Sequence, residues 1–302
     1  MTEAARAAAA DPGQAGMSGQ PVLDRLVALL DLEVIEDNIF RGVSPADRPI
    51  RVFGGQVAGQ ALIAAGRTVP PDRHVHSLHA YFIRGGDPSI PIVYEVDRIR
   101  DGRSFTTRRV VAVQRGKAIF SLSASFQVIE PGLEHADPMP EVPAPENLPT
   151  YLDQVELAGH KLDLTRSMPR PIDIRYVSEP PWLSREKGPR EGRNQVWMRA
   201  DGKLADDPLL HVCVLAYASD MTLLDAPLAR HGKYWWLDKV NGASLDHAMW
   251  FHRPFRADEW VLYDCASPSA SGARGLATGR FFTQDGTLIA TVVQEGLLRV
   301  AD

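Results

Sequence analysis

The chain has 302 residues, of which 44% are apolar and 24% charged, and its formal net charge is −5 at pH 7. This average globular composition excludes a collagen, a coiled coil or a wholly disordered chain, and the charge gives no sign of a nucleic-acid partner. The two cysteines, Cys213 and Cys265, are too few for a disulfide scaffold or a structural zinc site. We expect both to be buried free thiols in a reduced, cytoplasmic protein.

The first 20 residues are rich in alanine and glycine and lack the apolar core of a signal peptide. We expect residues 1–20 to be a disordered tail, with Met17 as an alternative start of the protein. The longest unbroken apolar run, residues 212–218, is far shorter than the roughly 20 residues that a membrane span needs. No membrane span is therefore expected.

In the first half of the chain, leucines at helical spacing in residues 22–30 predict a short amphipathic helix, and residues 34–40 predict a first strand. Small residues then follow Gly54-Gly55 at helical spacing, which predicts a helix that another element can approach closely. Four strands are expected next, joined by short turns such as Asp101-Gly102 that favour antiparallel pairing: residues 76–84, 92–100, 103–114 and 118–129.

A proline-rich segment divides the chain, with six prolines between residues 131 and 149. Proline interrupts helices and the interiors of sheets. We therefore predict a linker over residues 131–171, which separates two halves with the same order of elements.

The second half repeats that order. Asp207-Pro208 predicts the start of a helix, and residues 209–217 are apolar nearly all round, as in a helix buried on most sides. His79 aligns with His247 at an offset of 168. The simplest interpretation is a tandem repeat, an α+β chain in which curved antiparallel sheets wrap around apolar helices. The strands expected here are residues 172–177, 194–200, 247–252, 260–266, 274–283 and 287–299.

Several longer motifs resemble the acyl-CoA thioesterase II (TesB-type) family, in the right order along the chain. They are VFGGQVAGQA at 52–61, HSLHAYF at 76–82, DGRSF at 101–105, YASD at 217–220, LDHAMWFHRP at 245–254, QDG at 284–286 and VQEG at 293–296. The resemblance extends over about residues 21–300, and several motifs together are more specific than one short pattern.

The resemblance implies a double hotdog fold, with an N-terminal repeat over residues 21–130 and a C-terminal repeat over 172–302 that carries the catalytic residues. It also implies hydrolysis of fatty acyl-CoA thioesters to free fatty acid and CoA, without a metal or an organic cofactor. Because the family commonly pairs such units further, a homo-oligomer is expected. Two alternatives stay open, a hotdog acyl-CoA hydratase or dehydratase and a non-catalytic acyl-CoA binding protein.

The resemblance further implies a catalytic carboxylate, hydroxyl and amide, which fall on Asp220, Ser244 and Gln294. The family representative has threonine where this chain has Ser244, so the hydroxyl is kept but is less constrained in χ1. Judged from the sequence alone, Asp220 opposes the dipole of the preceding helix or caps the next turn. Ser244 is otherwise an ordinary turn serine, and Gln294 a strand residue that faces solvent.

This trio suits the hydrolysis of a thioester by an activated water. Asp220 would accept a proton from the water as general base, and Ser244 would hold the water in line. The Gln294 amide would donate to the water or to the developing oxyanion. Direct attack by Asp220, which gives an anhydride, is the competing mechanism.

Other side chains are weaker candidates for chemistry. His74, His76 and His79 resemble metal ligands, but no carboxylate cluster accompanies them, so hydrogen-bonded histidines are expected. No nucleophile elbow and no glycine-rich nucleotide motif is present in the sequence. Two sets remain candidates for substrate contacts: aromatic residues for an acyl channel, Trp235, Trp236, Trp250 and Phe251, and arginines for the CoA phosphates, Arg103, Arg108, Arg109 and Arg274.

Overall fold

The computed structural model describes residues 18–45, 51–157 and 169–301, without the side chain of Trp236. The first half of the chain contains α2 (Gln20–Leu30), β1 (Glu33–Glu36), β2 (Ile39–Gly42), α3 (Gly54–Gly66), β3 (Arg73–Phe82), β4 (Ile92–Asp101), β5 (Phe105–Gln114) and β6 (Lys117–Val128). A short helix, α4 (Tyr151–Leu157), follows. The second half contains β7 (Ile172–Tyr176), α6 (Pro181–Ser184), β8 (Arg193–Ala200), α7 (Pro208–Ser219), α8 (Asp225–Arg230), β9 (Val240–Ser244), β10 (Asp246–Phe251), β11 (Val261–Ser271), β12 (Arg274–Thr283) and β13 (Leu288–Val300).

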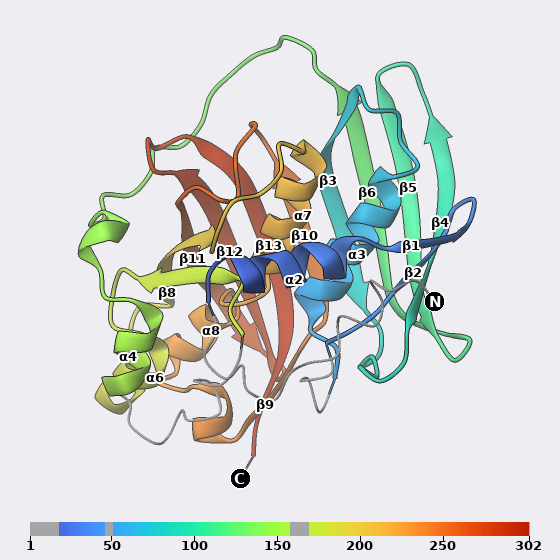
Figure 1. The fold of residues 1–302 in the computed structure, drawn as a ribbon. Helices are drawn as coiled ribbons and strands as arrows, with labels where there is room; N and C mark the ends of the chain where they lie inside the picture. Colours follow the sequence, from blue (N-terminus) through green and yellow to red (C-terminus); the bar gives the residue numbers. More distant parts are fainter. Residues whose placement is uncertain (1–17, 46–50, 158–168, 302) are drawn as a thin grey trace.

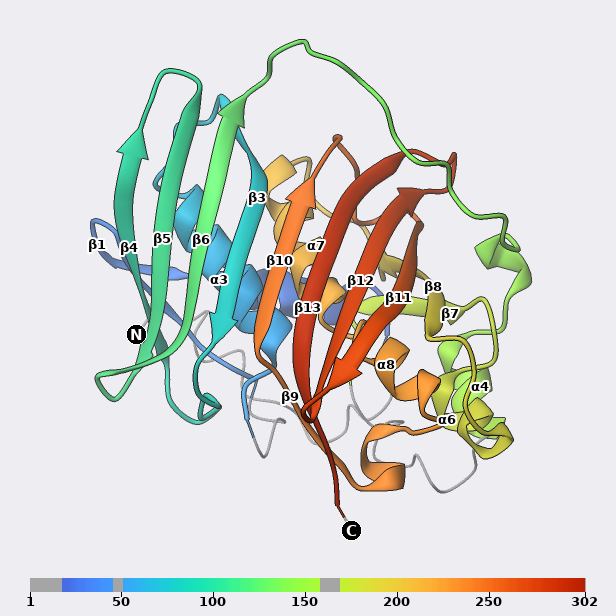
Figure 2. The same ribbon diagram turned by 180° about the vertical axis from the view of Figure 1, so that it is seen from behind.

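The strands of the described residues form one antiparallel sheet, in the order β1-β2-β4-β5-β6-β3-β10-β13-β12-β11-β8-β7, with β9 paired to β13. Its two halves join where β3 pairs with β10 (Figure 2). Both α3 and α7 lie on the same side of the sheet (Figure 1), and their side chains share one core with its inward residues. Cys213 and Cys265 are free and buried, as predicted. The expected α+β fold, with one central helix packed on each half of the sheet, is confirmed.

The two central helices approach each other closely and run in opposite directions. A Cβ on Gly55 of α3 would lie 2.3 Å from the carbonyl oxygen of Tyr217 in α7, and one on Gly66 would lie 2.5 Å from the Leu209 side chain. The small residues of α3 therefore permit the close packing that the sequence predicted. As a result, the first turn of α3 lies beside the last turn of α7.

Three features differ from the expectations. Residues 34–40 form the hairpin of β1 and β2 rather than one strand, because Asn38 adopts the left-handed conformation, at φ 64°. Strand β9 has no counterpart among the expected strands, and helix α4 lies within the predicted linker. The boundaries proposed for the two repeats and the linker stay a prediction.

The proline-rich segment packs against the outer face of the second half of the sheet. The Trp197 indole nitrogen donates to the carbonyl oxygen of Pro143, at 2.9 Å. Next to it, apolar side chains of the segment cover a small second core that contains Trp197, Trp260, Leu262 and Phe282, with Met139, Val142 and Leu148 from the segment. This part of the linker is therefore packed on the fold, although its backbone forms neither strand nor α-helix before residue 145.

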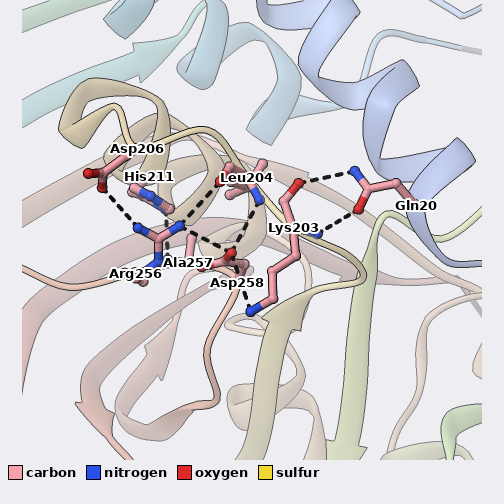
Figure 3. A network of polar contacts seen from close by, with 8 residues as sticks. All are labelled: Gln20, Lys203, Leu204, Asp206, His211, Arg256, Ala257 and Asp258. Atoms are coloured by element: carbon pink, nitrogen blue, oxygen red, sulfur yellow. Dashed lines mark hydrogen bonds and ion pairs between the residues drawn. The ribbon is translucent and has the colours of Figure 1, made fainter.

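The predicted disordered tail ends earlier than residue 20. Gln20 is the first residue of α2, and its side-chain amide exchanges two hydrogen bonds with the backbone of Lys203, at 2.7 and 3.0 Å (Figure 3). The preceding Gly19 amide donates to Asp201. These bonds attach the start of α2 to the second half of the chain, so the tail boundary at residue 20 is wrong. Residues 1–17, with the alternative start Met17, lie outside the described residues.

The same region holds the start of α7 in place (Figure 3). Arg256 pairs with Asp206 at 2.9 Å and with Asp258 at 3.0 Å, and Asp258 also accepts from the amide of Leu204 at 3.2 Å. His211 accepts a hydrogen bond at Nδ1 from the backbone of residue 257, at 3.0 Å. Burial and the nearby Arg256 charge lower the pKa of His211, which is consistent with an unprotonated Nδ1.

The two halves of the sheet share the same pairing register. The pairing of β5 with β6 shifts after Ala112, and that of β12 with β13 shifts after Phe281, at an offset of 169. Ala80 in β3 pairs with Leu122 in β6, and Met249 in β10 pairs with Val292 in β13. The offset is therefore 169 between β3 and β10, and 170 between β6 and β13. This regular register supports the interpretation of a tandem repeat.

The register also corrects one sequence alignment. With an offset of 169, His79 corresponds to Ala248, which is also its partner across the β3–β10 junction, and His247 corresponds to Leu78. The alignment of His79 with His247 at 168 is therefore wrong by one residue. A shift of one residue exchanges the faces of a strand, and accordingly His247 is buried whereas His79 is exposed.

Candidate active site

The three residues singled out for catalysis meet at the end of α7. Asp220 is the residue that ends this helix, Ser244 is the last residue of β9, and Gln294 lies on the neighbouring strand β13. The Ser244 hydroxyl donates to Asp220 Oδ1 at 3.0 Å. The Gln294 amide nitrogen lies 2.8 Å from the same oxygen and 2.7 Å from Ser244 Oγ. The three side chains therefore form a closed hydrogen-bonded triangle.

The ordinary interpretations of these residues do not fit the structure. The Asp220 carboxylate accepts from Ser244 and Gln294, and none of its described hydrogen bonds caps the following turn. Gln294 is fully buried, at 0% exposure, so the interpretation as a solvent-facing strand residue is wrong. Ser244 ends a strand that the sequence did not predict. Pairing of β9 with β13 brings Ser244 beside Gln294.

A buried histidine, missed as a site residue in the sequence, orients the Gln294 amide. His247 Nδ1 lies 2.9 Å from Gln294 Oε1, and His247 Nε2 lies 2.8 Å from Ser219 Oγ. Both protons of the Gln294 amide are directed at Asp220 and Ser244, so its oxygen faces the histidine and Nδ1 must carry the proton. Burial lowers the pKa of His247. The neutral ring therefore receives its second hydrogen bond from the Ser219 hydroxyl.

One carboxylate oxygen of Asp220 is held and the other adjoins a cavity. Oδ1 accepts from both Ser244 and Gln294, whereas Oδ2 has no hydrogen-bond donor among the described residues. A Cβ on Gly54, the first residue of α3, would lie only 2.6 Å from Oδ2. No described side chain caps the start of α3, where the first backbone N–H groups have no partner inside the helix. Oδ2 is thus the oxygen placed to accept a proton.

The cavity has a volume of about 880 Å³ and is lined by Asp220, Ser244 and Gly54. Its lining also includes three arginines, Arg51, Arg84 and Arg170, that the sequence analysis did not single out. Arg51 and Arg84 flank the motifs at residues 52–61 and 76–82, a signal that could have pointed to them. A positive charge at a cavity suits a ligand that carries phosphates.

The arginines proposed for CoA contacts do not line this cavity. Arg108 is buried, at 1% exposure, and pairs with Asp101 at 2.6 Å. Arg103 lies in the turn between β4 and β5, and the other two lie on strands and are paired: Arg109 with Asp97, and Arg274 with Glu295. The contacts of Arg108 are therefore structural, and none of the four arginines lies at the cavity that adjoins Asp220.

Of the aromatic and histidine candidates, some line the cavity and others have structural contacts elsewhere. Trp235 lines the cavity, whereas Trp250 packs edge-to-face on His79 and Phe251 belongs to the core. The side chain of Trp236 lies outside the described residues. His76 is hydrogen-bonded to Ser125 at 2.8 Å. In the part of the chain that the structure describes, no three His, Cys, Asp or Glu side chains are grouped to hold a metal, and no helix is long and apolar enough to cross a membrane.

Comparisons with known proteins agree with this geometry. The acyl-CoA thioesterase family matches residues 168–297, and the acyl-CoA thioesterase N-terminal domain family matches residues 44–127. The chain is 44% identical to acyl-coenzyme A thioesterase 8 of Mus musculus, over 96% of this chain and 93% of that protein. It is 40% identical to acyl-CoA thioesterase 2 of Haemophilus influenzae, over 93% and 99%.

Solved structures extend the likeness to the fold. The acyl-CoA thioesterase II TesB2 from Mycobacterium marinum is 47% identical and covers 92% of this chain and 99% of its own, with a TM-score of 0.75. A hot dog fold protein of unknown function from Alicyclobacillus acidocaldarius reaches a TM-score of 0.72 at 19% identity, with 92% and 99% covered. The latter likeness shows the fold alone, which is the hotdog fold expected from the sequence.

Proposed function

The chain belongs to the acyl-CoA thioesterase family and hydrolyses acyl-CoA thioesters, and from this premise we propose that Asp220 is the general base that activates the attacking water. The observation that carries the proposal is the unequal environment of the two carboxylate oxygens. Ser244 and Gln294 bind Oδ1, while Oδ2 adjoins Gly54 and the cavity. A base needs one oxygen free for the proton and a fixed orientation for the other.

In the proposed reaction, Oδ2 of Asp220 takes a proton from a water as the water oxygen bonds to the thioester carbon. Gly54 at the start of α3 adjoins this oxygen, and the free backbone N–H groups of that first turn can stabilise the negative charge that develops on the carbonyl oxygen. The carbon–sulfur bond then breaks, and the departing thiolate receives the proton from Asp220. Ser244 and Gln294 hold the carboxylate throughout, so no covalent enzyme intermediate is needed.

The substitution Asp220→Asn tests the proposal. Asparagine at this position would keep the size of the side chain and an acceptor for Ser244 and Gln294, but it is not a useful base. We expect kcat to fall by about 10²–10⁴, with no loss in the thermal midpoint, since a carboxylate at a helix C-terminus is unfavourable. The measurement is steady-state release of CoA with a thiol reagent, beside a melting curve.

The matched control is Asp207→Asn at the other end of α7, where the side chain accepts from the amide of Leu209. Asparagine caps a helix start as well as aspartate does, so this variant should keep its kcat. Near-wild-type turnover by Asp220→Asn would make Asp220 structural. A single turnover in ¹⁸O-water distinguishes the anhydride route, because label recovered in Asp220 would contradict direct attack by water.

A cytoplasmic location and a homo-oligomer also belong to the proposal. The two buried free thiols, Cys213 and Cys265, suit a reducing compartment. The open edges of the sheet at β1 and β7 leave backbone groups without a strand partner among the described residues, which suits further assembly. Fractionation of the native host and light scattering of the purified protein measure these two properties.

A further inference from the structure

The cavity extends beyond Asp220 to an aromatic end built by the second half of the chain. Trp182 of α6 is surrounded there by Tyr176, with ring centroids 5.1 Å apart, Tyr151 at 5.3 Å and Tyr234 at 5.7 Å. All four residues line the same cavity as Asp220 and Ser244. An acyl chain that leaves the thioester site therefore has a path to this aromatic end.

Three polar groups at the aromatic end have unused hydrogen-bonding capacity. Trp182 Nε1 is buried, and neither it nor the Tyr176 hydroxyl has a hydrogen bond to any described residue. Asp225, 3% exposed, also lines the cavity; its Oδ1 accepts from Trp235 Nε1 at 2.6 Å, while Oδ2 has no donor among the described residues. Burial raises the pKa of Asp225 to about 7, against the Trp235 bond and the Arg190 charge.

These groups are costly in a cavity that binds only hydrocarbon. A pocket for a plain alkyl chain is expected to be lined by apolar side chains with few polar groups, and phenylalanine in place of Tyr176 would serve it as well. A buried donor or acceptor without a partner lowers stability. Polar groups retained in this state indicate a partner that arrives with the ligand.

We propose that the aromatic end binds a hydroxyl group on the distal part of the acyl chain, with Trp182 Nε1 donating to its oxygen and Asp225 Oδ2 accepting its proton. This subsite rests on the proposed function of Asp220, because it presumes that the thioester lies at that residue. A hydroxyl needs one donor and one acceptor, which Trp182 and Asp225 supply. A carboxylate, which Arg170 over the Tyr151 ring would attract, has no proton to donate to Asp225, and an ammonium group has no use for the Trp182 donor.

The chain limits how far this hydroxyl lies from the thioester. Asp220 and Asp225 are separated by five residue steps, so their Cα atoms lie no more than about 18 Å apart. That distance is within the reach of a medium- to long-chain acyl group. The subsite would therefore favour acyl-CoA esters that carry a hydroxyl at one position within this reach over unsubstituted esters of the same length.

The experiment compares pairs of acyl-CoA esters with the same number of carbons, one unsubstituted and the other with a hydroxyl at successive distal positions. For each pair we measure the ratio of kcat/KM, hydroxylated over plain. One hydrogen bond contributes about 0.5–1.5 kcal/mol, so wild-type protein should prefer the best hydroxylated ester by about 3–10-fold. Trp182→Phe and Asp225→Asn should each remove most of this preference.

The control is Tyr94→Phe, which removes a buried hydroxyl bonded to Gln60 at 2.7 Å in the first half, away from the cavity. It should leave the ratio unchanged. The proposal is overturned if wild-type protein shows no preference at any distal position, or if Trp182→Phe and Asp225→Asn lower both rates equally. Failure of Asp220 as the base would instead appear as normal turnover of both esters by Asp220→Asn, with the ratio unaffected.

Discussion

The two central helices end in opposite ways. The residue that ends α3 is Arg67, which donates to the carbonyl oxygen of Leu32 at 2.6 Å and pairs with Asp31. The residue that ends α7 is Asp220. A cation at a helix C-terminus is electrostatically favourable and an anion is not. The end of α3 thus follows the rule for stability, whereas the end of α7 departs from it where the proposed base is needed.

The sheet shows the same contrast at equivalent positions. With the offsets of the two halves, His247 corresponds to Leu78 and Gln294 to Ala124, which pair with each other in the first half. Both first-half residues are apolar and buried. Duplication therefore supplies two similar frameworks, of which one carries an apolar interior and the other a buried polar cluster. The difference predicts where substitutions will affect stability and where they will affect turnover.

The largest effect, on the free energy of unfolding, is expected from Arg108→Met just beyond the end of α3. Arg108 is 1% exposed, donates to Thr68 Oγ1 at 2.8 Å and to its carbonyl oxygen at 3.0 Å, and pairs with Asp101. Asp101 is more than half exposed and stays solvated, but the two Thr68 oxygens would each lose a donor at about 1–3 kcal/mol, so the free energy of unfolding should fall by about 2–6 kcal/mol. The measurement is urea denaturation, with kcat recorded below the transition.

Because Arg108 lies outside the cavity, kcat of the folded protein should be unchanged. Arg109→Met on the same strand is the control, since Arg109 is an exposed residue with an exposed partner and should contribute less than about 1 kcal/mol. Equal destabilisation by both variants would contradict the structural role of Arg108 beside the end of α3.

Asp225 in the second half should make the free energy of unfolding decrease as the pH rises. Its pKa is raised to about 7 in the folded protein, above the ordinary value near 3.9 in the unfolded chain. Between these values the folded state binds more protons, so the free energy of unfolding decreases as pH rises from about 4 to 7. Asp225→Asn should match wild-type protein near pH 4 and exceed it by up to about 4 kcal/mol at pH 8.

Denaturation of both proteins across this pH range checks the sign. Asparagine still accepts from Trp235 Nε1, so packing should be retained. A gap that is already present at pH 4 would show that the substitution acts through packing rather than through the charge.

A somewhat smaller effect is expected on turnover from Gln294→Ala, which gives the second half the residue of the first. The variant loses the donor to Asp220 Oδ1 and Ser244. Removal of one oriented donor at an active site typically lowers kcat by about 10²–10³. Steady-state CoA release measures the effect. Gln127→Ala on β6, where the side chain is only partly buried, is the control and should keep its kcat.

The contrast also shows what the sequence could predict. Strong periodicity gave α3, α7 and most long strands within a few residues. It missed β9, which is short and pairs only with β13, and the β1–β2 hairpin, whose turn depends on the conformation of Asn38. Local patterns contain no information on such pairings, which depend on residues distant in the chain.

The candidate site depended on the family resemblance for the same reason. Ser244 and Gln294 are 50 residues apart and meet only because β9 pairs with β13. His247 was missed because its role depends on contacts with Gln294 and Ser219, which are distant in the chain and carry no local signal. Periodicity assigned the faces of the long strands, but it could not place a polar side chain beside another element.

The smallest effect is expected from His247→Leu, which again introduces the first-half residue. His247 contacts Gln294 and Ser219 and does not line the cavity, so it acts on the reaction only through the Gln294 amide. Without it, Gln294 Oε1 loses its donor and the amide can turn away from Asp220. We expect kcat to fall by about tenfold, the equivalent of about 1.4 kcal/mol, with little change in KM.

A double variant tests directly whether His247 positions Gln294. If His247 acts through Gln294, the double variant His247→Leu/Gln294→Ala should be no slower than Gln294→Ala alone, because the amide that the histidine orients is already absent. A merely structural histidine would lower the melting temperature and add its full effect to that of Gln294→Ala. Additive losses in kcat would therefore separate His247 from the catalytic cluster and leave Gln294 oriented by Asp220 and Ser244 alone.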